Sequence, residues 1–248
     1  MTPFWGDSAV TLFNADCRAA MAELEPESVD LVIWDPPYNM GKAYDGYEDN
    51  LPAEEHEAML SEVASELLRV AKPGVSMYGS CSVPMIWTLR PLLESAGWTF
   101  ADLLIWYGPN GFSNRVQTRW AILYESIFHM VNGECRTMMR VAEARKMRVW
   151  YHGVITEPRP QSNFKGHQKR VHPTQKPVGL YVKLMAQHYP GVVLDPMAGV
   201  GTTGLAAKVL GWQGILIEQS ELYCKRAAAR LSGGIERLDG QQGLEGIS

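Results

Sequence analysis

The sequence lacks the features of a membrane or secreted protein. No apolar run approaches the roughly 20 residues that a helix needs to cross a bilayer. The segment from Met1 to Asp7 has no basic stretch followed by an apolar one, so we expect no signal peptide and a cytoplasmic chain. The four cysteines are dispersed without a C-x-x-C pair, which argues against a zinc site and a disulfide framework. We therefore expect neither a metal nor a membrane partner.

The composition has no bias toward disorder, coiled coil or collagen. Hydrophobic residues make up 46% of the 248 positions and charged residues 20%, close to the average for globular proteins. A chain of this length suits one compact α/β domain with a full core and does not require a second.

The net charge of −4 conceals an uneven distribution of charge along the chain. Residues 131–176 contain ten Lys and Arg against three Glu, a net +7, which leaves −11 on the rest. Basic side chains neutralise phosphates and release counterions, so this segment indicates a polyanionic partner, although the whole chain is acidic.

Short apolar runs alternate with amphipathic stretches over most of the chain, which is typical of an α/β protein with a largely parallel sheet. We expect strands at 29–34, 75–78, 103–107, 122–130, 192–194 and 214–217. We expect helices at 54–70, 85–95, 177–188, 203–210 and 221–231. The helix at 54–70 precedes Lys72-Pro73-Gly74, a strong stop signal. The pattern weakens after Met130, where we expect a small insertion, and the Gly- and Gln-rich tail after Ser232 is predicted to be mobile.

The segment Asp35-Pro36-Pro37-Tyr38 directly follows the predicted strand 29–34, at the strand end where open α/β sheets bind ligands. Consecutive prolines fix the backbone and remove N–H donors, so the loop offers the Asp35 carboxylate and the Pro36 carbonyl as a rigid pair of acceptors. A base amine is a poor nucleophile, and two such hydrogen bonds favour the pyramidal nitrogen that attacks a methyl group. The ring of Tyr38 can stack on an extruded base. Taken alone the tetrapeptide is more often a turn, and a second motif is what favours the catalytic interpretation.

That second motif is a glycine-rich turn. The predicted strand 192–194 leads into Asp195-Pro196-Met197-Ala198-Gly199-Val200-Gly201-Thr202-Thr203-Gly204, and Glu218 lies 19 residues beyond Gly199, where a ribose-binding acid is expected. Both a nicotinamide-dependent oxidoreductase and a methyltransferase can use this pattern. The extra carboxylate of Asp195 suits a ligand with an ammonium and a sulfonium better than it suits a pyrophosphate.

Together these residues resemble the amino-methyltransferase family of DNA modification enzymes. Asp35–Tyr38 is similar to the D-P-P-Y catalytic motif of that family, and Asp195–Thr203 is similar to its D-P-F-x-G-x-G-T-T cofactor motif, with Met197 in place of Phe. His172-Pro173-Thr174-Gln175-Lys176-Pro177 is similar to the H-P-T-Q-K-P motif that precedes the helix covering the methionine end of the cofactor. Leu12–Cys17 also resembles the opening strand of the family, whose acid approaches the cofactor adenine.

The order of the motifs, with the catalytic one first, resembles the permuted β group of the family. The resemblance implies a Rossmann-like methyltransferase fold with a mixed, mostly parallel sheet, in which Asp35 and Asp195 lie on neighbouring strands. It divides one domain into a catalytic half at 1–130, a target-recognition insertion at 131–171 and a cofactor-binding half at 172–248. It implies S-adenosylmethionine as cofactor, double-stranded DNA as substrate, and a base extruded from the duplex. The resemblance leaves open whether the chain forms a homodimer.

The site residues follow from the motifs and the charge distribution. The expected catalytic residues are Asp35, Pro36, Pro37 and Tyr38. The expected cofactor contacts are Asp16, Cys17, His172, Thr174, Gln175, Lys176, Asp195, Pro196, Met197, Ala198, Gly199, Gly201, Thr202, Thr203 and Glu218. The candidate DNA contacts are Asn39, Arg115, Arg119, Arg145, Lys146, Arg148, Lys165, Lys169 and Arg170.

Several other activities compete with this interpretation. Cytosine-C5 methylation uses a nucleophilic cysteine, usually presented after proline, and no cysteine of this chain follows a proline. A protein-glutamine methyltransferase uses a related N-P-P-Y loop, against which Asp35, the motif order and the basic insertion all count. A DNA-binding module without activity and a nicotinamide oxidoreductase are more distant alternatives. Adenine N6 and cytosine N4 need the same pair of acceptors, and only the resemblance, through the Asp at the first motif position, favours adenine.

Overall fold

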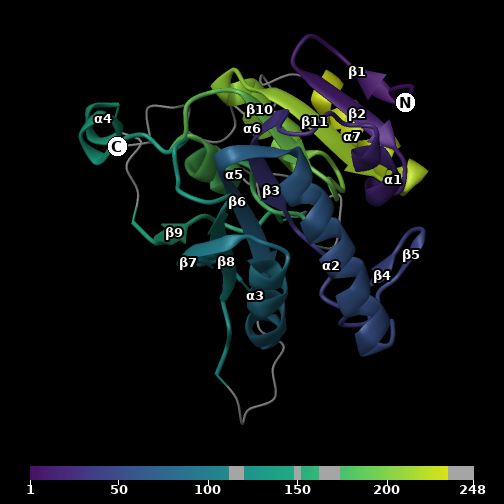
Figure 1. Ribbon diagram of the computed structural model, residues 1–248. Helices are drawn as coiled ribbons and strands as arrows, with labels where there is room; N and C mark the ends of the chain where they lie inside the picture. The colour runs from purple at the N-terminus through teal and green to yellow at the C-terminus, as the bar shows by residue number, and fades with distance from the viewer. Residues whose placement is uncertain (112–119, 148–151, 162–173, 234–248) are drawn as a thin grey trace.

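The structure, a computed structural model, describes residues 1–111, 120–147, 152–161 and 174–233. In these residues a sheet of nine strands has the order β1-β2-β11-β10-β3-β6-β8-β7-β9, and a separate hairpin pairs β4 with β5 (Figure 1). The strands are β1 (Trp5–Gly6), β2 (Val10–Asn14), β3 (Val29–Trp34), β4 (Ala43–Tyr44), β5 (Tyr47–Glu48), β6 (Ala71–Cys81), β7 (Thr99–Tyr107), β8 (Tyr124–Val131), β9 (Val154–Thr156), β10 (Val192–Asp195) and β11 (Gln213–Glu218). The α-helices are α1 (Cys17–Ala22), α2 (Ala53–Val70), α3 (Ile86–Ser95), α4 (Val141–Lys146), α5 (Val178–Met185), α6 (Thr202–Leu210) and α7 (Glu221–Ser232), with a 3-10 turn at Val83–Met85.

The centre of the sheet is parallel, from β2 through β11, β10 and β3 to β6. Antiparallel pairs flank this centre, β1 beside β2 on one side and β8 between β6 and β7 on the other. The prediction of an α/β fold with a mixed, mostly parallel sheet is confirmed.

Helices cover both faces of the sheet, because side chains of the central strands alternate between two cores. Leu31 and Ile33 of β3 pack in one core with apolar residues of α5, α6 and α7. Val32 and Trp34 of the same strand pack in the other core with residues of α1, α2 and α3 (Figure 1). A strand that is buried on both faces needs a continuous apolar run, which explains Leu31–Trp34 of β3.

The paired strands β3 and β10 mark the point where the chain order reverses. From β3 the chain continues through α2 to β6 on one side, and from β10 it continues through α6 to β11 on the other. The loops that leave these two strands therefore diverge. Such a switch point is where open α/β sheets form ligand crevices at the carboxyl ends of their strands.

The structure corrects some predicted boundaries and adds short elements. The predicted strand 75–78 begins earlier, at Ala71, because Lys72-Pro73-Gly74 forms an irregularity inside β6 rather than a break. Gly74 takes φ +85°, and a Cβ there would lie 2.8 Å from Arg136, so only glycine fits this bend. The predicted strand 103–107 begins at Thr99. The sequence did not predict α1, α4, β1, β9 or the β4–β5 hairpin, which are each six residues or shorter and carry too few apolar positions to show a period.

The segment 131–171 is partly incorporated in the main sheet. Its strand β9 pairs in parallel with β7, and Met138 forms an isolated bridge with His188. The predicted mobile tail lies outside the described residues from position 234. In the described part of the chain, no helix is long and apolar enough to cross a membrane.

Candidate active site

Two predicted motifs meet at the switch point of the sheet. Asp35 follows the last residue of β3, Asp195 is the last residue of β10, and the two strands are paired, which confirms that the carboxylates lie on neighbouring strands. Both carboxylates line one cavity of about 410 Å³. Residues from the two halves of the chain therefore form a single site.

The Asp35–Tyr38 loop is fixed by one bond from α2 and by one bond within the loop. His56 of α2 lies with its Nε2 atom 3.0 Å from the Pro37 carbonyl oxygen. The Tyr38 hydroxyl donates to Asp35 Oδ1 at 3.1 Å, which holds the tyrosine ring beside the carboxylate. Burial and the neighbouring Asp35 charge raise the pKa of Tyr38, so its hydroxyl stays neutral and remains a donor.

The turn after the motif is organised by Asp49, whose carboxylate accepts backbone N–H bonds from Asn39, Met40 and Lys42 at 2.8, 3.1 and 2.9 Å. Asn39 takes φ +53° and exchanges two side-chain hydrogen bonds with the backbone of Leu51. Both polar groups of the Asn39 side chain, a predicted DNA contact, are thus already used to shape the loop.

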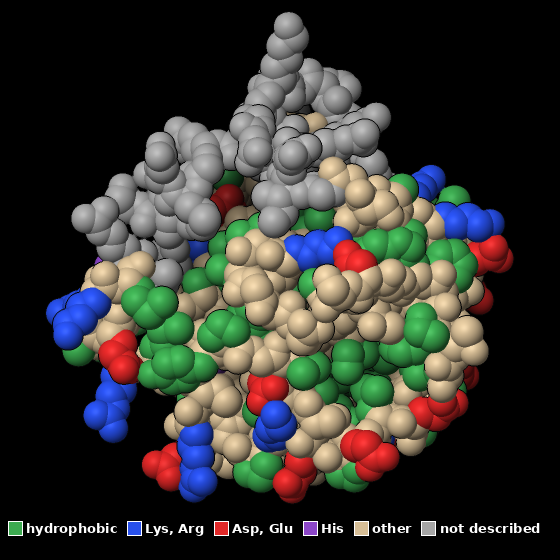
Figure 2. All heavy atoms as spheres, turned by 90° about the horizontal axis from the view of Figure 1, so that it is seen from above, with side chains coloured by type: hydrophobic (Ala, Val, Ile, Leu, Met, Phe, Trp, Pro, Cys, Tyr) green, Lys and Arg blue, Asp and Glu red, His purple; other side chains and the backbone are tan. Residues whose placement is uncertain are grey.

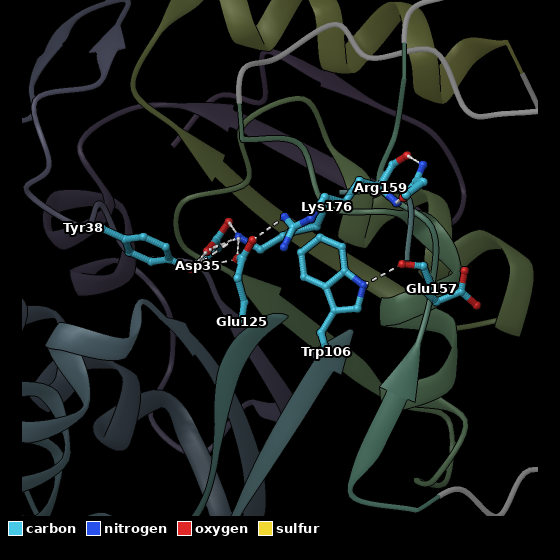
Figure 3. A network of polar contacts seen from close by, with 8 residues as sticks. Asp35, Tyr38, Trp106, Glu125, Glu157, Arg159 and Lys176 are labelled. Carbon is cyan, nitrogen blue, oxygen red and sulfur yellow. Dashed lines mark hydrogen bonds and ion pairs between the residues drawn. The ribbon is translucent and has the colours of Figure 1, made fainter. Parts of the chain in front are cut away.

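Lys176 lies against the predicted catalytic carboxylate. Its ammonium is 2.7 Å from both carboxylate oxygens of Asp35 and 3.2 Å from Glu125 Oε2, and only 5% of its side chain is exposed (Figure 3). Burial raises the pKa of Asp35, and the positive charge of Lys176 opposes that rise. Burial would lower the pKa of Lys176, but the two carboxylates outweigh it and raise that pKa, so the lysine remains protonated.

Glu125 and Arg159 extend this network, and neither is among the predicted site residues. The Arg159 guanidinium donates to Glu125 Oε1 at 2.6 Å and lies 4.4 Å from the centre of the Trp106 ring (Figure 3). Lys176 and Arg159 together lower the pKa of Glu125 against the effect of its burial. The one available signal was that Glu125 is the only charged residue of the apolar run predicted as strand 122–130.

The glycine-rich turn has the backbone that the motif predicts. Gly199 and Gly201 take φ +54° and +74°, a region that favours glycine, and nothing lies within 4 Å of a Cβ built on Gly199, so its backbone borders open space. A Cβ on Gly204 would lie 2.8 Å from Leu216, which shows that α6 packs directly on β11. The turn thus exposes backbone to the cavity and holds its helix close to the sheet.

Three carboxylates mark the predicted cofactor end of the cavity. Glu218, the last residue of β11, accepts the backbone N–H groups of Gly199 and Ser220, both at 2.8 Å. Asp195 accepts from the Met197 N–H and the Thr203 hydroxyl, and burial raises its pKa to about 7. Asp16 caps α1 and is exposed. This acidic lining suits a cationic ligand that carries hydroxyl groups.

Most other predicted cofactor residues of the described chain also line the cavity, namely Cys17, Thr174, Gln175, Lys176, Pro196, Met197, Ala198, Gly199 and Thr202. Gly201 and Thr203 do not line the cavity, and the Thr203 hydroxyl donates to Asp195. The β4–β5 hairpin adds Tyr44, Asp45 and Tyr47, which the sequence did not predict. The Tyr47 hydroxyl is buried, and the described part of the chain offers it no hydrogen-bond partner.

The candidate DNA contacts are mostly beyond what the structure describes. Arg115, Arg119, Arg148, Lys165, Lys169 and Arg170 lie outside the described residues, as does the predicted cofactor residue His172. Arg145 and Lys146 lie exposed on α4. On the face shown in Figure 2, the described basic and acidic side chains are interspersed. The described residues in that view do not form a continuous basic patch.

Comparison with known proteins gives concordant matches. A family model, N6_N4_Mtase, described as DNA methylase, matches residues 29–229. The chain is 30% identical to the DNA adenine methyltransferase YhdJ of Escherichia coli (strain K12), over 92% of this chain and 84% of that protein. It is 28% identical to the Type II methyltransferase M.HpaI of Haemophilus parainfluenzae, over 92% and 76% of the two chains.

Solved structures share the fold at low identity. The complex of M1.HpyAVI with SAM has a TM-score of 0.70 at 24% identity, covering 90% of this chain and 98% of that one. The cytosine-N4-specific PvuII DNA methyltransferase has a TM-score of 0.76 at 18% identity, covering 92% and 88%. The Rossmann-like methyltransferase fold expected from the sequence is thereby confirmed.

Proposed function

The chain belongs to the DNA methylase family and is thus an S-adenosylmethionine-dependent DNA methyltransferase of the N6-adenine or N4-cytosine type, and we propose that it methylates adenine N6 at specific sites in double-stranded DNA. The observation that carries the proposal is the Asp35 carboxylate, fixed at the switch point beside the Tyr38 ring. The adenine enzyme YhdJ, at 30% identity, supports the choice of base.

In this proposal the amine of an extruded adenine donates its two hydrogens to the Asp35 carboxylate and the Pro36 carbonyl, while Tyr38 stacks on the base. These bonds draw the nitrogen lone pair out of conjugation and stabilise the positive charge that develops as the nitrogen is methylated. Asp35 is also the contact to which the methylated nitrogen can release its proton. Pro37, fixed by His56, keeps the loop rigid.

The proposed cofactor residues fit the ligand by chemistry. S-adenosylmethionine supplies an activated methyl group on a sulfonium. We assign the ribose hydroxyls to Glu218 and the adenine end to Asp16 and Cys17, with the Gly199–Gly201 turn against the ligand. We assign the methionine end of the cofactor to Asp195, Thr174 and Gln175, and to His172 of the same sequence motif. Pro196, Met197, Ala198, Thr202 and Thr203 complete the turn.

We propose that residues 131–171 recognise the target sequence, between a catalytic half at 1–130 and a cofactor-binding half at 172–248. Arg145 and Lys146 are exposed candidates for phosphate contacts. The affinity for DNA should then fall as the salt concentration rises. Arg145, Lys146 and the other basic residues of the segment should all contribute to the slope of this dependence. Light scattering of the purified chain tests whether it forms a homodimer, which the resemblance leaves open.

The test is transfer of isotopically labelled methyl groups to DNA, followed by mass spectrometry of the digested nucleosides. We expect N6-methyladenine from the wild type. Asp35→Asn should lower the rate by about 100-fold or more, because the amide is neutral and presents one acceptor, while S-adenosylmethionine binding stays within about threefold. Asp102→Asn is the matched control, since that carboxylate is 67% exposed on β7 outside the cavity. Label in N4-methylcytosine would overturn the choice of base, and label in a protein glutamine would overturn DNA as the substrate.

A further inference from the structure

Four side chains of alternating charge form a continuous chain into the site. The positive groups are Lys176 and Arg159, the negative groups are Asp35 and Glu125, and the three contacts from Asp35 outward measure 2.7, 3.2 and 2.6 Å (Figure 3). The members come from the loop after β3, the residue before Pro177, strand β8 and the stretch after β9. Two positive and two negative charges leave the chain neutral, which allows it to lie in a mostly buried place.

The central contact is shared unequally. Lys176 lies close to both oxygens of Asp35 but somewhat farther from Glu125. An ammonium held wholly by Asp35 would keep that carboxylate ionised, yet it would also cancel the negative charge that a methylated amine needs. Glu125 draws the same ammonium in the opposite direction. The position of the lysine charge between the two carboxylates therefore sets how strongly Asp35 accepts hydrogen bonds.

Arg159, whose side chain is 28% exposed, is held by contacts of both its backbone and its side chain. Its backbone N–H donates to Asn110 Oδ1 at 2.7 Å, and Asn110 Nδ2 donates to its carbonyl at 2.9 Å. A Cβ on Gly108 would lie 2.8 Å from the Arg159 Nε atom, so this glycine leaves the space that the side chain fills. With Trp106 beneath its guanidinium, Arg159 is held against Glu125.

We propose that Glu125 and Arg159 are positioning residues for methyl transfer, which set how far the Lys176 ammonium is drawn from Asp35. This inference rests on the proposed role of Asp35 as acceptor for the base amine. It also makes Arg159 a contact through which the described part of residues 131–171 reaches the catalytic carboxylate.

The proposal predicts opposite effects for two neighbouring substitutions. Glu125→Gln removes the negative charge that competes for Lys176. The Lys176 ammonium then pairs with Asp35 alone, and the pKa of Asp35 falls. Arg159→Gln leaves the Glu125 charge unbalanced, so Glu125 holds the ammonium more strongly and the pKa of Asp35 rises. Glu125 contributes to the raised pKa of Asp35 in the intact site, behind burial and against Lys176, which agrees with these signs.

Other titratable groups surround Asp35, namely Tyr38, Tyr44, Cys81, Tyr181 and Asp195. Burial raises the pKa of the three tyrosines and of Cys81, so these four groups are neutral at the pH of the assay. Asp195, with a pKa raised to about 7, contributes to every pH profile. Its contribution is common to all variants and cannot produce shifts of opposite sign.

The experiment measures the single-turnover rate of DNA methylation between pH 5 and 9 with the full-length protein at saturating cofactor. We expect the acid limb of the profile to move about one unit lower for Glu125→Gln and about one unit higher for Arg159→Gln. Both variants should lose about 10- to 100-fold in plateau rate, with S-adenosylmethionine affinity preserved. Arg159→Lys should restore the position of the limb at least in part.

Glu66→Gln is the matched control, since Glu66 pairs with Arg69 at 2.9 Å on α2, outside both the chain of charges and the cavity, and its profile should overlay the wild type. If the acid limbs of Glu125→Gln and Arg159→Gln coincide, or move in the same direction, the proposal is overturned even if the plateau rates of both variants fall. Circular dichroism identifies a variant that does not fold, and Arg159→Lys then carries the test. A wild type that transfers no methyl group to DNA would instead overturn the proposed function, before any variant is compared.

Discussion

The contact between Lys176 and Asp35 allows a quantitative test of how the site is balanced. Lys176→Met leaves two carboxylates and one guanidinium, a net charge of −1 in a mostly buried place, whereas Asp35→Asn leaves +1. The double variant leaves only Glu125 and Arg159, which pair with each other at 2.6 Å. Each single substitution therefore leaves one buried charge without a partner, and the double substitution leaves none.

The size of the effect follows from the burial of the pair. Removing one partner of a buried ion pair costs about 3–5 kcal/mol, whereas replacing both is often nearly neutral. Asp35 is 22% exposed, and in Asp35→Asn the lysine keeps Glu125, so we expect about 2 kcal/mol there and about 3 kcal/mol for Lys176→Met. The double variant should lose about 1 kcal/mol of unfolding free energy. The sum of the two single losses exceeds this value by about 4 kcal/mol, which is the coupling energy of the pair.

Urea unfolding of the wild type, the two single variants and the double variant at pH 7.5, followed by fluorescence and circular dichroism, measures this double-mutant cycle. For a chain of this size, Lys176→Met should also lower the Tm by roughly 6–12 °C. Burial without the lysine raises the pKa of Asp35 above its unfolded value, so the deficit of Lys176→Met should be largest at neutral pH and shrink toward pH 4. If the two losses add within about 0.5 kcal/mol, the contact carries no coupling and the reasoning about stranded charge is refuted.

Two further predictions concern stability away from the charges. Gly204→Ala should destabilise the chain by about 1–3 kcal/mol in urea, because its Cβ would lie 2.8 Å from Leu216, whereas Gly79→Ala, with nothing within 4 Å, should not. His188 is 1% exposed and bonds Tyr78 at 2.8 Å, and burial lowers its pKa to about 3. The unfolded chain binds a proton at His188 below about pH 6.5 and the folded chain does not, so stability should fall by about 1.4 kcal/mol for each pH unit below that value. His188→Asn should remove this part of the slope in parallel unfolding series, and an unchanged slope would contradict the assignment.

The sequence predicted those site residues whose role depends on a strand end. Asp35, Asp195 and Glu218 each lie at the carboxyl end of a strand, and an apolar run followed by a polar residue is visible in one dimension. The strand at 75–78 was predicted too short because Pro73 and Gly74 usually end an element. Here they bend β6 without interrupting its pairing.

Glu125 and Arg159 were not predictable in the same way, because their roles arise from contacts between distant positions. Glu125 meets an arginine 34 residues away and a lysine 51 residues away, and nothing near it in sequence indicates either partner. Lys176 was expected at the cofactor from its motif, and in the described structure it lines the cavity with its ammonium on Asp35. The motif identifies Lys176 as a site residue, but only the three-dimensional arrangement shows which side chains its ammonium contacts.

The reversal of chain order between β3 and β10 explains why such a chain of charges is needed. Placing the acceptor carboxylate and the cofactor turn on adjacent strands brings Asp35 near Asp195 in one cavity, where Asp35 contributes to the raised pKa of Asp195 and Glu125 contributes to the raised pKa of Asp35. Without a cation, burial and the Glu125 charge would leave Asp35 protonated, without the negative charge that the methylated amine needs. A cation fixed on Asp35 alone would cancel the charge on which catalysis depends. A lysine shared with a second carboxylate, itself anchored by an arginine, meets both requirements, since it keeps Asp35 ionised while leaving part of its negative charge for the base.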